Sequence, residues 1–167
     1  GSSPPLARVA RSRIALFERW VSGLLDGRPA SDLGCGEAVQ GLIGLGPGLT
    51  PAGDDFLAAV LAVLDVIGER EGHAAMAHAI VDALPALTTP LSACFLRAAA
   101  AGYVGETLHR AVSLIMTGDV DAAITAAGKI GHSSGWDMLA GILTMLRMAV
   151  PRRTARQALA AAVAGFN

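Results

Sequence analysis

Apolar residues recur every three or four positions along almost the whole sequence, and this spacing restricts the fold more than any other feature. Between Leu6 and Leu25, for example, Phe17, Val21 and Leu24 follow it, and the segment Asp26-Gly27-Arg28-Pro29 then stops the pattern. No segment shows the apolar and polar alternation of a half-buried strand. The sequence therefore predicts an all-α fold.

Glycine and proline divide the rest of the chain into further predicted helices. Residues suited to capping a helix stand before several of them, as Thr50 does before Pro51, and as Thr89, Asp119 and Ser133 do. We expect one domain over residues 1–167, a compact bundle of about seven or eight helices. The predicted helices after the first are Thr50 to about Ile67, Gly72 to Leu84, Pro90 to Ala101, Gly105 to Thr117, Asp119 to Ala127, Ser133 to Val150 and Thr154 to Ala164.

The composition narrows the class of partner. The formal net charge is -1, and no basic run is interleaved with aromatic residues, so neither a nucleic acid nor a membrane surface is predicted as a partner. Hydrophobic residues make up 53% of the chain, an excess that predicts burial in a core or against another copy or subunit. Because Cys35 and Cys94 lack metal-ligand spacing and no signal peptide is recognisable at the start, we expect a cytoplasmic protein.

A glycine-rich stretch, GLGPGLTPAGDDF from Gly44 to Phe56, interrupts the helical pattern. Its Gly-x-Asp-apolar-Leu-Ala motif starts at Gly53 and recurs at Gly135, and each copy opens a long apolar helix. This internal repeat predicts two central helices related by pseudo-symmetry, with their N-termini facing a shared cavity.

The first copy has the chemistry of an anion site. A helix N-terminus presents unpaired N–H groups and the positive end of a dipole. We therefore predict that Gly46, Gly48 and Gly53 hold a small anionic ligand, with the Thr50 hydroxyl as a further donor. Carboxylates beside an anion need another role, so the aspartates Asp54, Asp55 and Asp137 are candidates to bind Mg²⁺, to accept a substrate N–H or to act as a base.

The second copy adds a histidine and hydroxyl groups. His132 stands where it can donate a proton to a carbonyl or phosphoryl oxygen, and Ser133, Ser134 and Gly135 follow it at the start of the predicted helix.

A third polar break contains Thr89 and Ser92, whose hydroxyls either point into the same cavity or cap the helix from Pro90. Capping is the structural alternative for the whole set of candidates, because acidic residues and hydroxyls stabilise a first helical turn without any ligand.

Together the stretch GLGPGLTPAGDDFLA, the Thr-x-x-Ser element from Thr89 and the stretch GHSSGWDMLAGI resemble the signature segments of a bacterial family. That family includes the AllH-type subunit of oxamate carbamoyltransferase, and the similarity covers roughly Gly41 to Met148. Family members are typically longer at the N-terminus, so the chain corresponds either to the C-terminal part of a longer protein or to a shortened member.

The resemblance implies a subunit of a multi-protein enzyme of purine nitrogen catabolism, which interconverts oxamate and carbamoyl phosphate with oxalurate and phosphate. It implies FdrA-like companion subunits. In this interpretation Gly46, Gly48 and Thr50 hold a phosphoryl or carboxylate group, the three aspartates bind a metal or the amide nitrogen, and His132 and Ser133 stabilise charge at the carbonyl.

Two other functions stay open from the sequence. The chain can be a non-catalytic helical module that docks onto a catalytic partner, or a regulatory domain that binds a ligand without turnover.

Overall fold

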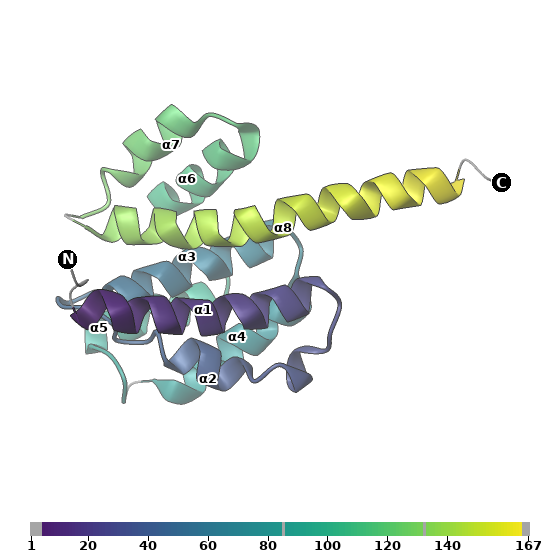
Figure 1. Cartoon of the computed structure of the whole chain (residues 1–167). Coiled ribbons are helices and arrows are strands. Elements are labelled where there is room, and N and C mark those ends of the chain that lie inside the picture. The colour runs from purple at the N-terminus through teal and green to yellow at the C-terminus, as the bar shows by residue number, and fades with distance from the viewer. Residues whose placement is uncertain (1–4, 85, 132, 165–167) are drawn as a thin grey trace.

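The computed structural model describes residues 5–84, 86–131 and 133–164, and over these ranges it contains eight α-helices and no strand (Figure 1). The predicted all-α fold is confirmed. The helices are α1 (Pro5–Leu25), α2 (Cys35–Gln40), α3 (Ala52–Val66), α4 (Arg70–Ala83), α5 (Pro90–Ala100), α6 (Glu106–Thr117), α7 (Val120–Ala127) and α8 (Ser134–Ala164), with a short 3-10 turn at Ala30–Asp32.

Helix α3 lies at the centre of the bundle. Every residue from Gly53 to Leu64 is buried, which explains the long apolar run in this part of the sequence, since a helix that is hydrophobic all round must be covered all round. Helix α8 passes between the pair α6 and α7 on one side and the group of α1, α2, α4 and α5 on the other, and its C-terminal half extends beyond the other helices (Figure 1).

The two repeat helices, α3 and α8, pack against each other more extensively than any other pair. A Cβ atom added to Gly141 of α8 would lie 2.5 Å from the carbonyl oxygen of Phe56 and 3.1 Å from the Cβ of Ala59. Ala59 and Gly141 occupy the same position in the two copies of the motif. A contact between equivalent positions is what a two-fold relationship produces, so the predicted pseudo-symmetry of α3 and α8 agrees with this contact and stays a prediction.

Two predicted helix starts are confirmed, and a third is wrong. Thr89 caps α5 by accepting a hydrogen bond from Ser92 N, and Asp119 caps α7. Thr50 is not the cap of α3, because Pro51 has an extended backbone and is itself the residue before the helix.

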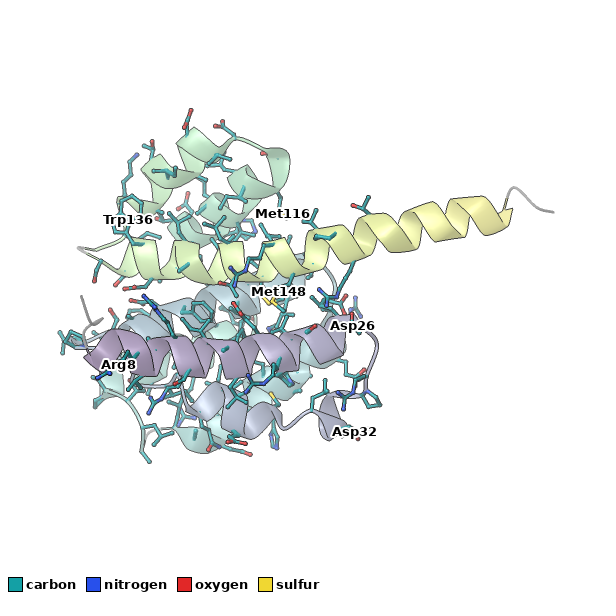
Figure 2. The ribbon with its side chains drawn as sticks, in the orientation of Figure 1. Arg8, Asp26, Asp32, Met116, Trp136 and Met148 are labelled. Atoms are coloured by element: carbon teal, nitrogen blue, oxygen red, sulfur yellow. The ribbon has the colours of Figure 1, made fainter. Side chains whose placement is uncertain are left out.

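The predicted helix break at Pro151 is also wrong, because α8 continues through it. Proline removes the backbone donor to the carbonyl four residues earlier, which here is that of Arg147. The Arg152 side chain donates to a different carbonyl, that of Met148, at 3.0 Å. Arg152 also binds Asp26 at the end of α1, at 2.6 Å, and Asp26 lies next to α8 in Figure 2. Across the described part of the chain, no helix combines the length and apolarity that a membrane span needs.

Candidate functional site

A cavity of about 550 Å³ lies beside the N-terminal turns of α3 and α8, and α5 and α6 complete its walls. Five of the residues predicted from the sequence to form a site line it: Thr50, Asp54, Asp55, Ser92 and Ser134. These residues come from three separate segments, so the fold brings together the glycine-rich loop, the Thr-x-x-Ser element and the second copy of the motif.

Asp54 holds two of those segments together. Its side chain is buried, and one carboxylate oxygen accepts a hydrogen bond from Gly44 N at 2.8 Å. The other oxygen accepts from the hydroxyl of Ser92 at 2.6 Å and from the hydroxyl of Thr88. Because both oxygens are engaged within the chain, the carboxylate of Asp54 fixes the cavity wall.

Asp55 differs from its neighbour in having an unsatisfied oxygen. The residue is only 6% exposed, and its Oδ2 atom is buried without a hydrogen-bond partner in the described part of the chain. Burial raises the pKa of the Asp55 carboxyl, and the charge of Asp137 also raises it. Hydrogen bonds from the hydroxyls of Ser134 and Thr50 lower this pKa. A buried carboxylate oxygen that lacks a donor is costly, so Asp55 favours a ligand that supplies an N–H or O–H group.

Two hydroxyls complete the polar end of the cavity. Thr50 Oγ1 and Ser134 Oγ are 3.1 Å apart, and both belong to the cavity wall. This contact joins the N-termini of α3 and α8 directly. Since either hydroxyl can donate or accept, the pair and Asp55 can bind a group that has both donors and acceptors.

Asp137, the repeat equivalent of Asp55, lies near it without lining the cavity. Burial raises the pKa of the Asp137 carboxyl, and its charge in turn acts on Asp55. Among the described residues, no three His, Cys, Asp or Glu side chains converge as a metal site requires. The magnesium site predicted on Asp54, Asp55 and Asp137 therefore gains no support from the geometry.

The predicted glycines shape the backbone around the cavity. Gly53 N donates to the carbonyl of Leu45 at 2.9 Å, and Gly135 N donates to the carbonyl of Ile130 at 3.0 Å. Gly46 and Gly48 have positive φ angles of 114° and 100°, which side chains rarely adopt. None of these four glycines is among the residues that line the cavity.

The remaining predicted residues lie outside the cavity wall. The Thr89 hydroxyl donates to the carbonyl of Leu49 at 2.5 Å and so ties α5 to the glycine-rich loop. Ser133 is exposed and directly precedes α8. His132 falls outside the described residues, so its predicted role as a proton donor stays a prediction.

Sequence reasoning missed most of the apolar wall and the cavity mouth. The wall includes Leu96, Val104, Leu108 and Met138, and the exposed side chains of Phe95, Tyr103 and Lys129 also line the cavity. The apolar positions carry the same helical spacing as core residues, so the sequence offers no signal that separates them. For Lys129 the sequence gives one weak indication of a place at the cavity, because this residue stands just before the second glycine-rich loop.

Comparison with known proteins places the chain in a family. The family model of the oxamate carbamoyltransferase subunit AllH matches residues 42–146, which is more than half of the chain and includes all the residues that line the cavity. No solved structure matches the chain. The matched segment contains both copies of the repeated motif and the Thr-x-x-Ser element, and the chain belongs to the family of the oxamate carbamoyltransferase subunit AllH.

Proposed function

We propose that this chain is a subunit of an oxamate carbamoyltransferase-type complex and that its cavity receives the carbamoyl group of a small substrate. The observation that carries the proposal is the buried Asp55 Oδ2 atom, which has no donor among the residues that the structure describes. A carbamoyl group is an amide nitrogen bonded to a carbonyl carbon, so it supplies N–H donors together with an acceptor oxygen. This combination matches the carboxyl and hydroxyl groups at the polar end of the cavity.

Each group at the polar end has a task in this proposal. Asp55 accepts a substrate N–H, and the hydroxyls of Thr50 and Ser134, which donate to Asp55 in the free chain, turn their single protons to the carbonyl oxygen when the substrate binds. The N-termini of α3 and α8 place positive dipole ends beside the same point, where negative charge develops on the carbonyl oxygen during acyl-type transfer. His132 and Asp137 remain candidates for proton transfer at the other copy of the motif, and His132 and Ser133 for stabilising charge at the carbonyl.

The proposal includes partner subunits. FdrA-like companion chains supply the rest of the reaction site, and the assembly acts in the cytoplasm in purine nitrogen catabolism. A small anion such as phosphate binds at the glycine-rich helix starts once the complex is assembled.

The first test is a thermal-shift measurement on the chain alone and on the chain with its partner subunits. Oxamate, oxalurate, carbamoyl phosphate and inorganic phosphate are compared, since a ligand at about 100 times its Kd adds about 2.7 kcal/mol to the free energy of unfolding. We expect the carbamoyl compounds to raise Tm, Asp55→Asn to remove the shift and Asp121→Asn, an exposed control, to keep it. Equal shifts in both variants would reject the assignment of Asp55.

A second candidate function is a docking or ligand-sensing module. It is favoured by the exposed apolar side chains of Leu91 and Phe95 on one face of α5 and of Tyr103 just beyond it, because exposed apolar patches mark interaction sites. If Phe95→Asp abolishes assembly while Asp55→Asn changes neither assembly nor turnover of the complex, the module is the better description. If Asp55→Asn stops turnover in an intact complex, the cavity is part of the reaction site.

A further inference from the structure

We infer that the start of α6, together with Lys129 and Tyr103, forms a second polar end of the cavity and holds the carboxylate of a carbamoylated acid whose N–H group lies on Asp55. This inference rests on the proposed function, and it assigns residues to the part of the substrate that the first polar end does not bind. The ligand class is an acid whose carboxylate stands several bonds away from its carbamoyl nitrogen, as in oxalurate.

The first turn of α6 opens onto the cavity. Gly105, the residue before the helix, and Thr107 in its first turn both line the cavity. No side chain of the described residues caps this helix start, so the N–H groups of the first turn are free to bind a ligand. A helix N-terminus binds a carboxylate through such groups and through its dipole, and the Thr107 hydroxyl is a further donor.

Two side chains beside this turn add a positive charge and a hydroxyl. Lys129 and Tyr103 line the cavity, and both are exposed, so they lie at its mouth. Lys129 follows α7, and because α7 packs antiparallel to α6, the end of α7 lies near the start of α6 (Figure 1). Within the described part of the chain Lys129 forms no ion pair. Its ammonium group can therefore bind a carboxylate by charge-assisted hydrogen bonds.

An apolar wall separates the two polar ends. On α5, Ser92 donates to Asp54 at the first end, and Ala99 lines the cavity close to the connection that carries Tyr103. The helix rises about 10 Å between Ser92 and Ala99, and the apolar Leu96 lies between them in the cavity wall. The extended chain from the carbamoyl nitrogen of oxalurate to its carboxylate covers about 6 Å. With a hydrogen bond of about 2.9 Å at each end, this length joins the two polar ends.

The charges of the cavity decide which end takes the carboxylate. The unsatisfied oxygen of the buried Asp55 side chain calls for a donor, and Asp54 lies in the same wall. Because like charges repel strongly in a buried site, a ligand bound to Asp55 must place its own carboxylate elsewhere. Lys129 is the one cation among the described lining residues. Oxamate is the part of oxalurate that bears the carboxylate, so it occupies the α6 end and leaves the carbamoyl group to Asp55.

The test is isothermal titration calorimetry on the full chain, alone and with its partner subunits, with oxalurate and its neutral amide, oxaluramide. We expect oxalurate to bind at least tenfold more tightly than oxaluramide, Lys129→Gln to remove this difference and Lys129→Arg to keep it. Arg110→Gln, which removes an exposed positive charge of α6 outside the cavity wall, is the matched control and should also keep it. A preference for oxalurate that survives Lys129→Gln overturns the inference.

Chemical labelling gives a readout that does not depend on activity. Lys129 is the only lysine in the sequence, so acetylation of lysine by an amine-specific reagent reports on this side chain alone. We expect saturating oxalurate to slow the acetylation of Lys129 at least fivefold, as measured by mass spectrometry of the peptide that contains it, and oxaluramide to slow it less than twofold. Equal protection by the two compounds would contradict a carboxylate site at Lys129.

The outcomes separate this inference from the proposed function. If Asp55→Asn weakens both compounds and Lys129→Gln weakens neither, the proposed function stays and the carboxylate end is rejected. If Lys129→Gln weakens oxalurate and Asp55→Asn changes nothing, the carboxylate end stays and the role of Asp55 is rejected. If Lys129→Gln weakens carbamoyl phosphate at least as much as oxalurate, the α6 end binds phosphate and its assignment to a carboxylate is wrong. Absence of oxalurate binding both alone and in the complex rejects both proposals.

Discussion

Asp54 and Asp55 are adjacent in the sequence, but among the described residues only Asp54 finds donors for both of its oxygens. Replacing Asp54 with Ala leaves the Thr88 and Ser92 hydroxyls and the Gly44 N–H without their acceptor. Since a hydrogen bond to a charged group contributes about 1.5–3 kcal/mol, we expect Asp54→Ala to lower the free energy of unfolding by about 3 kcal/mol or more. Urea unfolding followed by circular dichroism measures this loss.

The control for that prediction is Asp121→Ala, which removes an exposed carboxylate from the first turn of α7 and should cost less than about 1 kcal/mol. Equal losses in the two variants would show that the hydrogen bonds to Asp54 do not stabilise the fold.

Asp55 should make stability depend on pH in the direction opposite to a salt-bridged carboxylate. Its pKa is raised by burial in the folded state, whereas an unfolded Asp has a pKa of about 3.9. Between those two pKa values the folded chain keeps a proton that the unfolded chain has lost. The protonated Asp55 therefore contributes to the free energy of unfolding fully below about pH 3.9, and this contribution is lost as pH rises through the folded pKa.

We therefore expect the stability of Asp55→Asn, relative to the unchanged chain, to improve as pH rises from about 4 toward neutrality. Urea midpoints of the two proteins across this range test it. A difference that stays constant with pH would contradict the raised pKa of Asp55.

The sequence could identify both aspartates as candidates but could not separate their roles. The partners Thr88 and Ser92 lie 34 and 38 residues from Asp54 along the chain. Which carboxylate receives those hydroxyls depends on how α5 packs against α3, and this packing is not visible in any local pattern.

At the scale of the helices, the two repeat glycines mark where the N-termini of α3 and α8 press against other backbone. A Cβ at Gly53 would lie 2.0 Å from the carbonyl oxygen of Leu42, and one at Gly135 would lie 1.8 Å from that of Ala127. Each helix start must move to admit a methyl group. Gly53→Ala and Gly135→Ala should each destabilise the fold by about 1–3 kcal/mol, as measured by thermal unfolding.

Gly36 in α2 provides a matched control, because a Cβ there meets only the end of the flexible Gln40 side chain, at 3.9 Å. Gly36→Ala should stabilise the protein by about 0.5–1 kcal/mol through reduced backbone freedom. A gain in stability for Gly53→Ala as well would show that the close approach is not required.

Helix type was predictable from apolar spacing, whereas some boundaries were not. Pro51 shifts the start of α3 past the predicted cap at Thr50, and the Thr50 hydroxyl contacts Ser134 instead. Pro151 was predicted to end a helix, but α8 continues through it, and the next residue, Arg152, binds Asp26 at the end of α1. Tertiary contacts of this kind override local signals, and the sequence does not display them.

At the scale of the whole molecule, the repeated motif predicted two central helices whose N-termini face a shared cavity, and α3 and α8 pack against each other with their first turns beside one cavity. The cavity between them could be anticipated only at its polar end, since its apolar wall is assembled from α5, α6 and the segment before α8. Those residues differ from core residues only because they face a space that the packed helices leave open. The space forms only when the helices assemble, so no local sequence pattern indicates it.

Helix α1 lies outside the segment that matches the family and still completes the core. The Phe17 side chain is fully buried, and its ring lies 5.5 Å from the rings of both Trp20 and Phe56. Since Phe56 belongs to α3, this contact joins α1 to the helix that carries Asp54 and Asp55. Phe17→Ala leaves a cavity at that junction and should lower the free energy of unfolding by about 3–5 kcal/mol.

Val9→Ala is the control on the same helix, because Val9 is 41% exposed and its truncation should change stability by less than about 0.5 kcal/mol. Chemical unfolding of both variants measures the contrast. The large loss should appear together with weaker binding of amides at Asp55, since α1 supports the helix that positions this carboxyl. A Phe17→Ala protein as stable as Val9→Ala would mean that the matched segment forms its core without α1.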